Sequence, residues 1–256
     1  MDFSAEKAGR LQNGAQMVSF RAPHLNTVAF SVVLPFEPEA TPGVYHLIEH
    51  MFFERAGERR AAEINAEMTS RGSEIMGYTA INYMCFNFSC RREVFLPQLN
   101  LLFSMLTQRE YAREDFEKVL PVIRNEIFEN AFYDGRAADI LRELWFDSRY
   151  TAPVLGNAGV LEDLDFAEID EVRAKLFSRE MCVFLAGAFT TEQERAVTET
   201  FGSVPLCRLE RTPAREEEKE TREYNACGRG RQLQTLVTYH VERADKELKI
   251  AAHWLR

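Results

Sequence analysis

The feature that most constrains this chain is a polar cluster inside an apolar segment, residues 43–53, which read GVYHLIEHMFF. Three ionisable side chains, His46, Glu49 and His50, stand among large apolar ones. A helix that is apolar around most of its circumference is buried. Each buried polar group without a partner costs about 1–3 kcal/mol, and a charge costs more. The fold must therefore cover this helix and also give its polar groups a partner.

The spacing of these groups favours a metal ion as that partner. On a helix, His46 and His50 are one turn apart and share a face, so both imidazoles can reach one ion. Glu49 is offset by about 100° from His50, a position suited to meeting a water molecule at the metal. This H-x-x-E-H arrangement is the reverse of H-E-x-x-H and is typical of zinc peptidases. The alternative is three ordinary core residues, but one divalent cation satisfies all three at once.

A catalytic zinc needs a third protein ligand and an open position. The segment VIRNEIFENAFYDG offers Glu126 and Glu129, three residues apart on a helix expected after Pro121. Spacing alone does not choose between the two glutamates. Both can equally be solvated helix charges, which is the usual place of Glu.

The remaining pattern predicts an α+β fold, a two-layer sandwich with a largely antiparallel sheet and helices on one face. Alternating and apolar runs predict strands, and runs with helical spacing predict helices. Pro121 is expected to begin or kink a helix. The expected strands are 15–20, 27–36, one within 74–90, and 181–189. A turn at 23–26 is expected to join the first two strands. The expected helices are 44–53, 59–71, several across 94–147, 166–178 and 191–201.

The same pattern divides the chain into three parts. Residues 1–207 form the lobe that carries the metal motif. Residues 208–231 are rich in charge and read as a linker or exposed loop. Residues 232–256 contain two strand-like runs, LQTLVTYHV and ELKIAAHWLR, which are terminal strands or the start of a second lobe.

Composition excludes several classes of protein. The net charge of -9 and pI near 5.2 argue against a nucleic-acid partner, which would require a basic surface. No run reaches 18 apolar residues, so we expect no membrane span. The first residues, MDFSAEKAGR, lack the layout of a signal peptide, which favours a cytoplasmic location. Five cysteines without a C-x-x-C pair indicate reduced thiols.

The chain resembles the pitrilysin/insulinase family of zinc peptidases, which includes mitochondrial processing peptidase and the presequence peptidases. The resemblance lies in the segment GVYHLIEHMFFERAG and in a glutamate 76 residues after His50. Further segments that resemble the family are LQNGAQMVSF, RRAAEINAEMTSRGSEIMGYTAINYMCFNF, SREMCVFLAGAFT and LKIAAHWLR. The likeness covers most of the chain and implies one half-unit of a pitrilysin-like peptidase. It also selects Glu126 as the third ligand.

The resemblance implies a zinc-dependent endopeptidase. In that reading His46, His50 and Glu126 hold Zn²⁺, and Glu49 is the general base for a water activated by the metal. Unfolded peptides would add as a strand to a sheet edge formed by Met76, Gly77, Tyr78 and Thr79. A second homologous half-unit, in the same or another chain or as a homodimer, would close the site.

Three departures from the family pattern keep other readings open. Met76-Gly77 stands where the family often has Asn-Ala, and Val119 stands where it has an acidic residue seven positions before the third ligand. The family unit is also about twice as long. The alternatives are a non-catalytic peptide-binding or scaffold subunit, or a half-enzyme that needs its partner. A metal-storage domain has little support, since one ligand set is visible.

Overall fold

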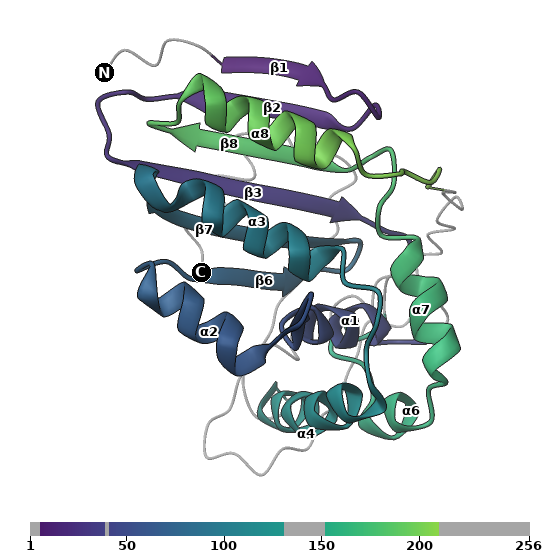
Figure 1. Cartoon of the computed structure of the whole chain (residues 1–256). Coiled ribbons are helices and arrows are strands. Elements are labelled where there is room, and N and C mark those ends of the chain that lie inside the picture. The colour runs from purple at the N-terminus through teal and green to yellow at the C-terminus, as the bar shows by residue number, and fades with distance from the viewer. Residues whose placement is uncertain (1–5, 39–40, 131–151, 210–256) are drawn as a thin grey trace, which may run out of the picture.

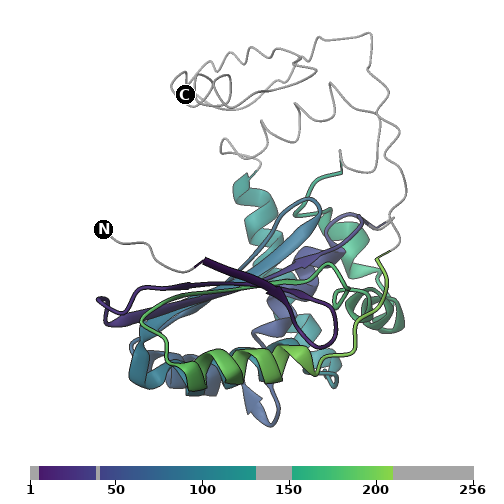
Figure 2. The same ribbon diagram turned by 90° about the horizontal axis from the view of Figure 1, so that it is seen from above.

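The computed structural model describes residues 6–38, 41–130 and 152–209, which form a sheet covered by helices on one face (Figures 1 and 2). The strands are β1 Glu6–Arg10, β2 Gln16–Arg21, β3 Thr27–Pro35, β6 Ile75–Thr79, β7 Tyr83–Arg91 and β8 Cys182–Gly187, with a short hairpin of β4 Arg55–Ala56 and β5 Arg59–Arg60. The helices are α1 Val44–Phe52, α2 Ala61–Ser70, α3 Phe95–Leu106, α4 Arg113–Asn130, α6 Ala158–Glu162, α7 Phe166–Ala174 and α8 Thr191–Gly202, with a 3₁₀ turn at Arg92–Val94. The α+β class predicted from the sequence is confirmed.

The main sheet has six strands in the order β1-β2-β8-β3-β7-β6. Every neighbouring pair is antiparallel except β2 and β8, which run parallel. The sequence predicted β2 and β3 as two strands joined by a turn, and both strands are present. They are not neighbours, however, because β8 lies between them: Val183 is opposite Met17 on one side and Val32 on the other. A strand from late in the chain thus completes the centre of the sheet.

Alternation along the strands turns one apolar face toward the helices. In β3 the buried residues are Val28, Phe30, Val32 and Leu34, while the residues between them are exposed or half-buried. The ring of Phe30 lies 5.3–6.4 Å from the rings of residues in β7, α3 and α8, namely Phe88, Phe95 and Phe201. Figure 1 shows α2, α3 and α8 over this face, while α1, α4, α6 and α7 gather beside β6.

Helix α4 bears on the expectation that a helix begins or kinks at Pro121, and it rules out a beginning there. It begins at Arg113 and continues through Pro121 to Asn130. A proline inside a helix removes one backbone hydrogen bond. The segment before it is nevertheless helical, because Phe116 and Val119 are buried on the same side as Ile123. Burial of one continuous apolar stripe outweighs the local effect of the proline.

Several expectations concern parts of the chain outside the described residues. These are the helical signal beyond residue 130, the charged segment 208–231 beyond residue 209, and the two strand-like runs within 232–256. The division of the chain into three parts therefore stays a prediction. Among the helices that the structure describes, none is long and apolar enough to cross a membrane.

Candidate metal centre

The helix α1 is held in place by contacts with α4, α7 and β6. It starts after Gly43, whose φ of 86° lies in the left-handed region that favours glycine. A Cβ at Gly43 would lie 2.5 Å from the Cα of Gly156, so two glycines let the loop before α6 pack against the start of α1. All residues of α1 except His50 are buried. The polar motif is thus inside the protein, as its apolar neighbours predicted.

Helix α4 brings Glu126 onto α1. Its N-terminal end is anchored by Asp115, which is 1% exposed, accepts a hydrogen bond from the backbone N–H of Ala112 and pairs with Arg55 of the β4–β5 hairpin. One helical face then buries Val119 and Ile123, and Glu126 follows on it, half-buried. Glu129, the other glutamate of this segment, is exposed and lies outside the cluster.

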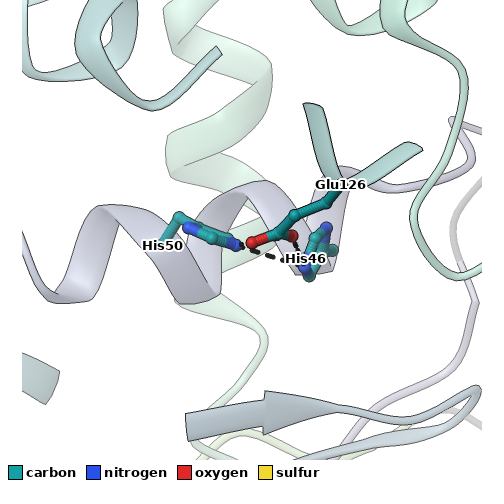
Figure 3. Close-up of side chains that lie close together, drawn as sticks. All are labelled: His46, His50 and Glu126. Atoms are coloured by element: carbon teal, nitrogen blue, oxygen red, sulfur yellow. Dashed lines mark hydrogen bonds and ion pairs between the residues drawn. The ribbon is translucent and has the colours of Figure 1, made fainter. Parts of the chain in front are cut away.

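The donor atoms of His46, His50 and Glu126 form a nearly equilateral triangle (Figure 3). The two Nε2 atoms are 3.2 Å apart, and Oε2 of Glu126 lies 3.2 Å from Nε2 of His46 and 3.3 Å from Nε2 of His50. Ligand atoms at about 2.0–2.1 Å from a tetrahedral zinc are separated by about 3.3 Å. The three side chains therefore fit a zinc ion without rearrangement, and a tetrahedral ion held by three ligands keeps one position open.

The electrostatics of His46 suit a ligand. Burial, and then the nearby charge of His50, lower the pKa of His46 to about 4, so its imidazole is neutral at neutral pH. Only a neutral imidazole has a lone pair for a metal. The Nδ1 atom of His46 is buried and has no hydrogen-bond partner among the described residues. Metal-bound histidines usually donate from their second nitrogen, and the described residues offer this ring no such acceptor.

Glu49 is buried on α1 and is held by the strand β6. The hydroxyl of Thr79 donates a hydrogen bond of 2.5 Å to its Oε2. The pKa of Glu49 is raised, mainly by burial and also by the charge of Glu126. The hydrogen bond from Thr79 and the charge of His50 act in the opposite direction and lower this pKa. The interactions with His50 and Glu126 indicate that this carboxylate lies close to the candidate metal ligands. It is a second carboxylate at the centre, outside the triangle.

The strand β6 is an edge of the main sheet, since β7 is its only strand neighbour in the part of the chain that the structure describes. It contains all four residues that the resemblance implied for substrate pairing. Met76 and Tyr78 are 53% and 47% exposed, whereas Gly77 and Thr79 are half-buried on the side of Glu49. The edge thus lies beside the candidate centre, and pairing with a peptide stays a prediction.

Comparison with known proteins places this geometry in a family. The model of the insulinase family, peptidase family M16, matches residues 35–145, which include the whole candidate centre. Residues 35–145 of the chain therefore match the insulinase family. The chain is 23% identical to an uncharacterized zinc protease of Rickettsia bellii over 199 residues, 74% of this chain and 47% of that protein. It is also 23% identical to an uncharacterized zinc protease of Bacillus subtilis, over 75% of this chain and 49% of that protein.

The fold of this chain is similar to solved structures as well. It superimposes on the peptidase M16 inactive domain from Pseudomonas fluorescens with a TM-score of 0.73 at 13% identity, over 81% of this chain and 53% of that one. The chain spans about half the length of the curated relatives it matches. At the level of the family, zinc protease names agree with the donor set of two histidines and a glutamate.

Sequence reasoning missed two contacts of this centre. The pair of Arg55 and Asp115 joins residues 60 positions apart, and nothing in the local pattern of either segment predicts it. Thr79 was expected only as part of a substrate strand, whereas its side chain binds Glu49. The one available signal was that Thr79 comes two residues after Gly77, because alternate residues of a strand face the same side.

Proposed function

We propose that this chain is the zinc-bearing half of a metalloendopeptidase that cleaves unfolded peptides. The observation that carries the proposal is the triangle of His46, His50 and Glu126, with sides of 3.2–3.3 Å, beside the buried carboxylate of Glu49. All four groups have the chemistry that peptide hydrolysis by a zinc enzyme requires. We propose His46, His50 and Glu126 as the ligands and Glu49 as the catalytic base.

When bound, zinc supplies a Lewis acid that lowers the pKa of water and polarises a carbonyl. The residues of the chain supply the rest. Glu49 accepts the proton from the attacking water and delivers it to the amine that leaves, so the carboxylate is regenerated at the end of each cycle. Burial raises the pKa of Glu49, which makes it a stronger base than an exposed glutamate.

The substrate class follows from the position of β6. An extended peptide can continue the sheet by forming backbone hydrogen bonds with an edge strand. A peptide on β6 would pass beside Gly77, next to Glu49. A folded protein does not offer such a free strand, so we propose unfolded peptides as substrates.

We further propose that the working enzyme contains a second homologous half-unit, from the same chain, another chain or a second copy. The chain spans about half of its curated relatives, which supports this. A half-unit that binds peptides without cutting them is the alternative. Val119 and the unpartnered Nδ1 of His46 favour that alternative, because an unsupported ligand can weaken metal binding or activity by about 10–100-fold.

The test combines metal analysis with peptide cleavage. Wild-type protein should contain about one zinc per chain and cut a fluorogenic unstructured peptide, whereas Glu49→Gln should keep its zinc and lose turnover. Glu126→Gln should lose zinc, and Glu129→Gln, an exposed position on the same helix, should not. Wild-type protein without stoichiometric zinc, or equal cleavage by wild type and Glu49→Gln, would refute the proposal.

Size-exclusion chromatography of the active fraction then identifies the working assembly. Activity that elutes only with a dimer, or only after a homologous second unit is added, supports the need for a partner. Full activity in a monomer of this chain contradicts it.

A further inference from the structure

We infer that Thr79 is a positioning residue for Glu49: its hydroxyl fixes the orientation of the carboxylate and leaves one defined oxygen to take the proton. The inference rests on the proposed function, because it assigns a role within that same site. It starts from the contact of 2.5 Å between Thr79 Oγ1 and Glu49 Oε2. These residues lie 30 positions apart, on β6 and α1, so the contact is made by the fold.

The two oxygens of Glu49 have different surroundings. Oε2 accepts the hydrogen bond from Thr79. Oε1 lies next to Gly77, since a Cβ built on that glycine would be 3.0 Å from it. Gly77 and Thr79 are alternate residues of one strand and therefore face the same side of it. One short stretch of β6 thus binds Oε2 through Thr79 and lies beside Oε1 at Gly77.

This arrangement suits a base that must work repeatedly in one geometry. A carboxylate on a glutamate side chain can rotate about its terminal bond, which has broad torsional preferences. A hydrogen bond to Oε2 restricts that rotation and occupies Oε2, so Oε1 is the oxygen available for the proton. Hydrogen bonds to a charged acceptor are stronger than those between neutral groups. Thr79 therefore holds the Glu49 carboxylate in one orientation.

The test compares Thr79→Val, which replaces the hydroxyl with a methyl group, with Thr79→Ser, which keeps the hydroxyl. Thr79→Val should lower kcat by about 10–100-fold, the usual effect of losing a hydrogen bond to a charged group, with KM and zinc content unchanged. Thr79→Ser should stay within about threefold of wild type. Thr27→Val, at an exposed threonine on β3, is the matched control and should behave as wild type.

Crystal structures of wild type, Thr79→Val and Thr79→Ser give a readout that does not depend on turnover. The Glu49 carboxylate should keep its orientation in wild type and the serine variant and should rotate or occupy several positions in the valine variant. An unchanged carboxylate in Thr79→Val, or a kcat equal to wild type, overturns the inference. Equal losses in the valine and serine variants overturn it as well. If no variant and no wild-type protein cleaves peptides, the proposed function fails, while the structures still decide the role of Thr79.

Discussion

Gly77→Ala is the substitution that tests most directly how the sheet edge controls the candidate base. A Cβ at Gly77 would lie 2.9 Å from Cε1 of Phe86, and 3.0 Å from both Oε1 of Glu49 and Cε2 of Phe53. Carbon atoms pack at about 3.5–4.0 Å, so the methyl group overlaps the two ring carbons by about 0.5 Å or more and also crowds Oε1 of Glu49. Phe86 is fully buried on β7 and cannot yield easily. The half-buried Phe53, Glu49 or the strand β6 must therefore move.

The magnitude follows from these overlaps. Overpacking of this kind costs about 1–3 kcal/mol, and the lower chain entropy of alanine offsets about 0.4–1 kcal/mol of it. At about 2–4 °C per kcal/mol for a chain of this size, Tm should fall by up to about 10 °C. A displacement of about 1 Å at a reacting group can cost 10²-fold, so a shift of a few tenths of an ångström should lower kcat by roughly tenfold.

The assay measures Tm by calorimetry and kcat and zinc content on the same preparations. Gly9→Ala is the matched control, since Gly9 lies on β1, the opposite edge strand, where an added Cβ would meet no atom within 4 Å and φ is not positive. It should leave Tm and kcat unchanged or raise Tm slightly. If Gly77→Ala matches Gly9→Ala in both quantities, the tight packing of β6 against Glu49 is refuted.

The remaining predictions concern stability and metal binding. Asp115→Ala leaves Arg55 without its partner and should destabilise the fold by about 3 kcal/mol, lowering Tm by about 6–12 °C. Burial raises the pKa of Asp115, but hydrogen bonds from Arg55 and Ala112 outweigh burial, so the pKa in the folded state lies below 3.8. The unfolded state therefore binds more protons than the folded state near this pH, and the stabilisation is lost as the pH falls below 3.8. Thermal melts should show this loss in wild type but not in Asp115→Ala. Zinc at 100 times its Kd should raise the stability of wild type by about 2.7 kcal/mol, and His50→Ala should show little of this shift. Val119→Glu buries a carboxylate at a position that is 2% exposed in the apolar stripe of α4, so it should lower Tm in thermal melts, and an unchanged Tm would show that the position tolerates the acidic residue of the family pattern.

The sequence could predict the parts of this fold that depend on local periodicity. The alternation of Phe30 and Val32 predicts a half-buried strand, and the spacing of His46 and His50 predicts one face of a helix. Strand order depends on contacts distant in sequence, which is why the insertion of β8 between β2 and β3 had no local signal. Pro121 did not mark the start of a helix, because the local preference of proline gave way to burial of the α4 face.

In the candidate centre, too, some positions follow from the local pattern and others depend on packing. His46, Glu49 and His50 lie close together on one helix, so the helix itself sets their arrangement. Glu126 comes from another element, and its spacing from Glu129 did not decide which glutamate points inward. That choice is made by packing: the face of α4 that buries Ile123 against the rest of the fold also carries Glu126 to α1.

The position of the candidate base depends finally on the register between β6 and β7. Gly77 is opposite Phe86 and Thr79 is opposite Met84, and both β7 residues are fully buried. A slip of one residue would turn every side chain of β6 to the other face and bring Met76 or Tyr78 against Glu49. That slip would also remove Ile75 from the core, where it is 3% exposed. The apolar core that fixes this register therefore also keeps the glycine and the hydroxyl of β6 at the carboxylate.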